Sequence, residues 1–362
     1  MKYDVVVIGA GPGGIFTAYE LAKAEKGLSI AVLELGRPLD KRKCPIDGKT
    51  VKSCVKCPVC SIMSGFGGAG AFSDGKYNIT NQFGGTLFEH VGKREAIELM
   101  RYVDGINLAH GGEGTKLYST ANSKLKKKCL ENGLHLLDAQ VRHLGTDINY
   151  VVLENIYAEL RDKVDFRFNT AVTAVEKTEE GYAVLAGDER FECRDCVISV
   201  GRSGSKWMES VCRELQIPTH SNRVDIGVRV ELPAEVFSEL TDELYESKII
   251  YRTEKFEDMV RTFCMNPHGV VVNENTNGIV TVNGHSYEDT DHLKCLPEGL
   301  GRILGNYSAV LCDLKEFSLS LFILALSCLT LSFFSHSVSV GDESLALDDA
   351  GFPVVDLSLI FH

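Results

Sequence analysis

The sequence predicts an α/β fold whose first domain is built on a parallel sheet. Three features predict it: an apolar run at residues 3–8, a glycine-rich turn directly after it, and a second apolar run at 28–33 that ends in an acid. Short runs without polar alternation are typical of strands buried on both faces. Residues 15–26 have the spacing of a helix that packs on such a sheet.

The turn consists of Gly9, Ala10, Gly11, Pro12, Gly13 and Gly14. In a strand–turn–helix unit, Gly9 allows the tight turn and Gly11 lets the backbone approach a diphosphate. Gly14 allows the helix to pack closely on the strand. The N–H groups of the first helical turn, reached through Pro12 and Gly13, favour a phosphate. The whole unit therefore predicts a dinucleotide site.

An acid follows the second strand, as such a site requires. Glu34 lies 20 residues after Gly14 and is expected to accept hydrogen bonds from ribose hydroxyls, with Leu35 beside it at the cofactor. Its negative charge disfavours the 2′-phosphate of NADP.

Composition excludes some classes of function. The chain has 362 residues, enough for two domains, and a net charge of −12, which argues against non-specific nucleic-acid binding. The chain starts directly with the first strand and shows no signal peptide, so a cytoplasmic protein with reduced thiols is expected. The sequence leaves the oligomeric state open.

The predicted domains are a first one over residues 1–204, with an irregular insertion at 36–76, and a mixed α/β substrate domain over 205–290. Within the first, helices are expected at 115–131 and 149–160 and a strand at 135–141. A β meander is expected from 164, and its last strand runs into Gly201. The insertion is too long for a simple connection, which points to a functional role.

The insertion carries four cysteines and a glycine run. Cys54, Cys57 and Cys60 have the spacing of a metal site, and Cys44 would have to serve as the fourth ligand. An iron–sulfur cluster, structural zinc and reduced thiols all stay open as alternatives.

The glycine run includes Gly67 and Gly68. No strand precedes it, so it is interpreted as a loop whose backbone passes close to the cofactor, with Ser73 as a candidate polar contact.

Residues 291–362 differ from the rest of the chain. No Lys or Arg occurs after Lys315, and residues 318–334 form an uncharged apolar run. The run is short for a membrane span and lacks basic flanks and aromatic anchors, which argues against an anchor. A buried segment, an out-of-frame tail and an anchor are the three interpretations.

Several motifs together carry a family likeness: the unit at 4–34, the glycine loop at 60–76, residues 143–147, 200–204, 224–231, 261–267 and 282–287. On these the chain resembles bacterial and archaeal FAD-dependent dehydrogenases of the two-dinucleotide-binding-domain flavoprotein type, in a subgroup with a cysteine-bearing loop. The resemblance implies a Rossmann-like FAD-binding domain, with the ADP half of FAD on residues 9–34 and Gly201 at the cofactor.

The predicted function is an FAD-dependent oxidoreductase that transfers a hydride between flavin and a small organic substrate or NAD(P)H. His285 is the candidate general acid or base. The family usually continues into a Gly-Asp-Gly-Ala-Gly type motif, which is not found here. The alternative is therefore a non-catalytic remnant that acts at most as a nucleotide-binding module.

Overall fold

The computed structural model describes residues 1–24, 26–46, 50–51, 54–219, 227, 229–230, 233–255, 257–276 and 279–285, with side chains up to residue 269. The predicted tail at 291–362, with its apolar run, lies outside the described residues. In the described part, no helix is long and apolar enough to cross a membrane.

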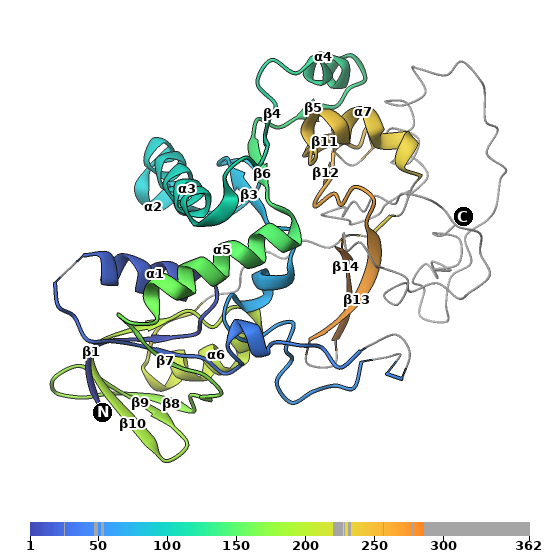
Figure 1. Ribbon diagram of the computed structural model, residues 1–362. Helices are drawn as coiled ribbons and strands as arrows, with labels where there is room; N and C mark the ends of the chain where they lie inside the picture. Colours follow the sequence, from blue (N-terminus) through green and yellow to red (C-terminus); the bar gives the residue numbers. More distant parts are fainter. Residues whose placement is uncertain are drawn as a thin grey trace. The chain divides into compact units, whose positions relative to one another are not determined.

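The chain divides into two compact units, each made of several segments. The helices and strands of the described residues are labelled in Figure 1. The first comprises Met1–Tyr77, Arg94–Lys116 and Arg142–Arg223, and the second comprises Asn78–Lys93, Leu117–Val141 and Val224–His362. This division differs from the boundaries expected at 204 and 290. The first unit runs on through helix α6 (Ser205–Glu214), and the second takes in two earlier segments.

A six-stranded sheet with the order β7-β2-β1-β10-β9-β8 forms the frame of the first unit. Its strands are β1 (Lys2–Ile8), β2 (Ile30–Leu33), β7 (Asp165–Arg167), β8 (Ala174–Lys177), β9 (Tyr182–Ala186) and β10 (Glu189–Ile198). β1 pairs in parallel with β2 and β10, and β2 pairs in parallel with β7. β8, β9 and β10 form the antiparallel meander. The predicted α/β fold with a parallel sheet and a meander is confirmed.

Two details of the meander differ from the prediction. β7 was expected in the meander but lies at the parallel edge, where Asp165 pairs with Ala31. The two last strands expected are one continuous strand, β10, because both halves have a partner. Residues 189–193 pair with β9, and residues 192–198 pair with β1.

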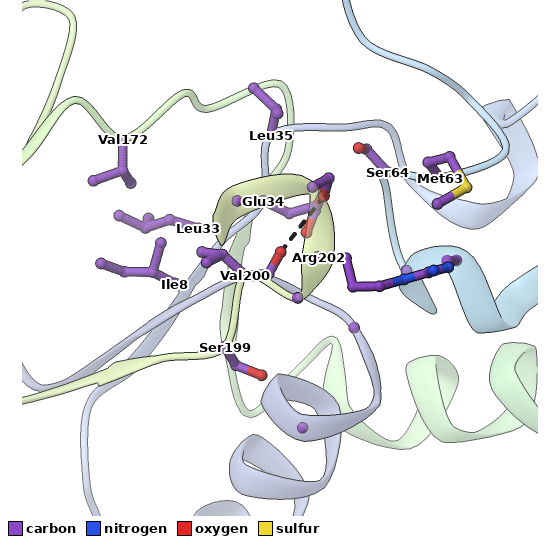
Figure 2. Close-up of a pocket in the computed structure, with 18 of the residues that line it drawn as sticks. Ile8, Leu33, Glu34, Leu35, Met63, Ser64, Val172, Ser199, Val200 and Arg202 are labelled. Carbon is purple, nitrogen blue, oxygen red and sulfur yellow. Dashed lines mark hydrogen bonds between the residues drawn. The ribbon is translucent and has the colours of Figure 1, made fainter. Parts of the chain in front are cut away.

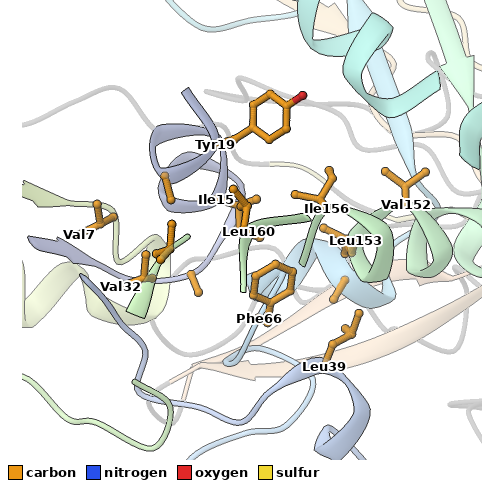
Figure 3. Close-up of a cluster of buried hydrophobic side chains, with 14 of the residues drawn as sticks. Val7, Ile15, Tyr19, Val32, Leu39, Phe66, Val152, Leu153, Ile156 and Leu160 are labelled. Atoms are coloured by element: carbon orange, nitrogen blue, oxygen red, sulfur yellow. The ribbon is translucent and has the colours of Figure 1, made fainter. Parts of the chain in front are cut away.

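Helices cover both faces of this sheet. On one face, α1 (Pro12–Lys23) and α5 (Gly145–Leu160) pack on Val7 and Val32, with Phe66 in the same cluster (Figure 3). On the other face, α6 packs through Val211 on the cluster that contains Val6 and Ile8. Alternate residues of β1 therefore point to opposite cores, which explains its uninterrupted apolar run.

The other elements are α2 (Leu87–Val91), α3 (Lys93–Asn107), β3 (Lys76–Ile79), β4 (Leu117–Ser119), α4 (Lys124–Glu131), β5 (His135–Leu136), β6 (Gln140–His143), α7 (Ala234–Leu244), β11 (Ile249–Arg252), β12 (Met259–Arg261), β13 (Val270–Thr276) and β14 (Ile279–His285). The helix predicted over 115–131 is thus wrong in its first half. Its start is displaced because the Ser123 side chain caps α4, accepting a hydrogen bond from the Leu125 N–H at 3.1 Å. The strand predicted over 135–141 is divided between β5 and β6.

Candidate functional site

A cavity of about 440 Å³ opens where three parallel strands of the first unit end. In the register of the sheet, Ile8 is the partner of both Leu33 and Ile198, so β1, β2 and β10 end together. The Gly9 N–H then donates to the Leu33 carbonyl, and the Ser199 N–H to the Ile8 carbonyl, both at 2.8 Å. The carboxyl edge of a parallel sheet is where open α/β folds bind ligands.

The fingerprint glycines are required for different reasons. Gly9 has a φ of +100°, and a Cβ there would lie 2.4 Å from the Ser199 carbonyl oxygen. At Gly14 a Cβ would lie 1.9 Å from the Gly9 carbonyl oxygen. Both are therefore required by the fold, in the turning and packing roles predicted. At Gly11, by contrast, a Cβ would meet no atom closer than the Gly68 Cα at 3.9 Å.

The Glu34 carboxylate lies at the cavity but is largely engaged by the protein itself. It is 6% exposed. Its Oε2 accepts from the Ala10 N–H at 2.7 Å, and its Oε1 accepts from the N–H groups of Gly36 and Gly65, each at 2.8 Å. A carboxylate offers about four acceptor positions, so Oε2 keeps one for a ligand hydroxyl. Glu34 thus joins the fingerprint turn to the glycine loop, a role the sequence did not reveal.

The glycine loop forms a second wall of the cavity. Besides the Gly65 contact, the Gly67 N–H donates to the Ala10 carbonyl at 2.8 Å, and Gly68 lies against Gly11. Between them Phe66 is fully buried and its ring packs edge-on against Tyr157 at 4.9 Å. The loop is therefore fixed to both the fingerprint and the core.

Arg42 holds the outer part of this loop. Its guanidinium donates to three carbonyl oxygens, those of Ser61 at 2.8 Å, Ile62 at 2.7 Å and Phe66 at 2.6 Å. Burial lowers the pKa of Arg42 to about 10, so the side chain keeps its charge at neutral pH. This contact sets the position of Met63 and Ser64, which also line the cavity.

Most of the predicted cofactor residues converge. The cavity is lined by Gly9, Gly11, Pro12, Gly13, Glu34, Leu35, Gly68 and Gly201. Gly14, Gly67 and Ser73 are not among its lining residues, because Gly14 packs against Gly9 and Gly67 donates to Ala10. The Ser73 Oγ donates to the Gly70 carbonyl at 2.8 Å and so shapes the loop.

Sequence reasoning missed several lining residues. Thr170, Ala171 and Val172 precede β8, and Ser199, Arg202 and Trp207 follow β10. Of these, Arg202 could have been predicted at the cavity from the sequence, since it directly follows Gly201, which was predicted there. Figure 2 shows Ile8, Leu33 and Val172 grouped at the left of the view as an apolar part of the cavity. Arg202 lies to the right of this group.

The predicted metal ligands do not form a preassembled set. Cys44, Cys54, Cys57 and Cys60 are all described, but among the described residues no three His, Cys, Asp or Glu side chains are grouped to hold a metal ion. The segment from 54 to 60 has no regular structure, and Cys54 and Cys60 are exposed to solvent. Metal binding stays a prediction.

His285 is the last residue of β14, and its side chain lies outside the described part. It belongs to the second unit, whereas the cavity belongs to the first.

No protein-family model matches the chain. An uncharacterized protein from Clostridium beijerinckii is 28% identical over 303 residues, which cover 80% of this chain and 50% of that protein. The chain thus spans about half the length of this curated relative.

Among solved structures, glycine oxidase from Geobacillus kaustophilus is similar with a TM-score of 0.39 and 12% identity, over 87% of this chain and 84% of that one. NikD, an amino acid oxidase of nikkomycin biosynthesis, has a TM-score of 0.39 and 11% identity, over 91% and 77%. An L-α-glycerophosphate oxidase from Mycoplasma pneumoniae, solved with FAD bound, has a TM-score of 0.32 and 14% identity, over 58% and 57%. At these TM-scores the likenesses carry no functional conclusion.

Proposed function

We propose that this chain is an FAD-dependent oxidoreductase whose flavin exchanges a hydride with a small organic substrate or with NAD(P)H. The main support is Gly11. Its φ of −76° is open to any residue, and a Cβ there would meet no atom closer than 3.9 Å. The fold itself does not require glycine at this position. Glycine at position 11 is required instead by a ligand whose diphosphate lies against the backbone at the start of α1, because a Cβ would occupy that place.

The glycine loop favours FAD over a nicotinamide dinucleotide as the resident group. It gives the cavity a second wall, with Gly68 facing Gly11 and Gly70 continuing the lining. Glycines along such a wall suit a ligand that extends beyond its ADP half. Bound FAD would supply the hydride acceptor. The chain's own residues hold the nucleotide: Glu34 at a ribose hydroxyl and the first N–H groups of α1 at a phosphate.

A nucleotide-binding module without redox activity is the second candidate. It is favoured by Glu34 and the start of α1, since the contacts assigned to both at the cavity are with the ADP half of a dinucleotide. A module that recognises only the ADP half would bind ADP and FAD equally. An FAD enzyme binds FAD at least about tenfold more tightly than ADP, because flavin contacts add to those of the ADP half.

The test is flavin reconstitution of the purified chain with a matched pair of variants. We expect the wild type to be isolated yellow or to take up FAD, and Gly11→Ala to lose FAD affinity at least about tenfold with its melting temperature unchanged. Gly105→Ala is the control, because Gly105 lies in α3 with nothing within 4 Å of a Cβ. A colourless protein that cannot be reconstituted would refute the proposal.

A further inference from the structure

The cavity contains two charged side chains among its described lining residues, one of each sign. Glu34 is buried and accepts three backbone N–H groups. Arg202 is exposed, and within the described part of the chain its guanidinium has no ion pair or hydrogen-bond partner. An arginine held at a cavity without a protein carboxylate is available to an anionic ligand.

The position of Arg202 is set by the sheet. β10 ends at Ile198 in register with Ile8, and the turn Arg202–Gly204 follows directly after Gly201. Figure 2 shows the Arg202 side chain extending from this turn toward the segment that carries the glycine loop. The start of α1, at Gly11, Pro12 and Gly13, lines the same cavity. A cation and a helix N-terminus therefore line the same open cavity.

We infer that Arg202 binds the second phosphate of the dinucleotide, while the N–H groups at the start of α1 bind the first. This inference rests on the proposed function, because it presumes a nucleotide in the cavity. A guanidinium donates two parallel N–H bonds to one phosphate group, and such charge-assisted bonds are stronger than neutral ones. The site therefore selects nucleotides with a diphosphate over nucleoside monophosphates.

The experiment compares ADP, FAD and AMP binding to the full chain by calorimetry. For Arg202→Met we expect the affinities for ADP and FAD to fall about ten- to a hundredfold, and the affinity for AMP to change less than about threefold. Arg202→Lys keeps the positive charge but cannot donate two parallel N–H bonds, so its affinities for ADP and FAD should lie between those of the wild type and Arg202→Met. Arg213→Met is the control, since it removes the same charge from an exposed α6 residue that pairs with Glu209. Circular dichroism verifies that each variant is folded.

The outcomes separate the two ideas. If the wild type binds none of the three nucleotides, the proposed function fails and this inference fails with it. If the wild type binds ADP and FAD but Arg202→Met binds them equally well, only the role of Arg202 is refuted. An equal loss for AMP and ADP refutes it too, because the contact is then not with the second phosphate.

Discussion

Single residues of the fingerprint have separate roles, and the sequence predicts only some of them. Gly9 and Gly14 were predictable from the local turn with its φ of +100° at Gly9 and from the contact of Gly14 with Gly9, whereas the approach of Ser199 to Gly9 was not. Glu34 was predicted at the ribose, but it accepts N–H groups from the fingerprint turn, from its own turn and from the glycine loop. The last of these requires residues 34 and 65 to meet, which no local pattern encodes.

Replacing Glu34 by glutamine tests this joining role. In Glu34→Gln the amide NH₂ would face an N–H donor, so at least one buried donor loses its acceptor, and charge assistance is lost at the others. We expect the free energy of unfolding to fall by about 2–3 kcal/mol, measured by urea denaturation. Glu113→Gln removes the same charge from an exposed residue and should stay within about 0.5 kcal/mol of the wild type. Equal stability of the two variants would contradict the role.

At the scale of the element, the described residues between 36 and 75 contain two short 3-10 helices, Leu39–Lys41 and Gly68–Phe72, and side-chain contacts hold them in place. Arg42 and Phe66 anchor this segment. In Arg42→Met three carbonyl groups lose their donor, so we expect a loss of about 3 kcal/mol in stability and faster proteolysis within residues 43–60. Arg37→Met is the control. The side chain of Arg37 is exposed, and its main-chain carbonyl, which accepts from the Phe66 N–H, is kept in the variant. Cleavage at the same rate in both variants would disprove the anchoring.

Thiol labelling distinguishes the cysteines of this segment from a core cysteine. Burial in α4 raises the pKa of Cys129 to about 11, whereas Cys54 and Cys60 are exposed. Since the thiolate is the reactive form, we expect a thiol reagent at pH 8 to modify Cys54 and Cys60 in the native protein and Cys129 only after unfolding. Peptide mass spectrometry reads the sites. Protection of Cys54 and Cys60 that a chelator removes would support the metal prediction.

Elements with a strong local signal were predictable, and those with competing signals were not. β1, α1 and β2 have an apolar pattern and a glycine turn that agree. Residues 115–131 have a helix-like composition, but Asn122 has a φ of +63° and Ser123 caps α4, so the chain turns there. Before that turn, β4 takes residues 117–119, because strand pairing decides a short segment more than its propensity does.

At the scale of the whole molecule, each described hydrophobic cluster consists of residues from one unit only. Val7, Ile15 and Phe66 belong to clusters of the first unit, while Leu125, Leu240 and Val260 form the core of the second. A unit with its own core is expected to unfold as a cooperative body. The sequence predicts a first domain over residues 1–204 that is interrupted by the insertion at 36–76, whereas residues 78–93 and 117–141 belong to the second unit.

Calorimetry tests this independence. We expect two thermal transitions, and ADP at a hundred times its Kd should stabilise only the one that carries the cavity, by about 2.7 kcal/mol. The control is AMP at the same multiple of its own Kd, which should give the same shift. A single transition would contradict the independent unfolding of the two units, and a shift of both transitions by ADP would contradict the assignment of the cavity to the first unit alone.

The sequence by itself determined the α/β class, the β1–α1–β2 unit and the glycines at its turn, because these depend on residue spacing over a few tens of positions. The glycine loop was predicted near the cofactor, but only the tertiary structure decided that Gly68 and Arg202 line one cavity with that turn. Their approach depends on the parallel pairing of β1 with β10 and on Glu34 and Phe66 anchoring the loop. Such long-range contacts are selected by the packing of the whole unit, which no local pattern records.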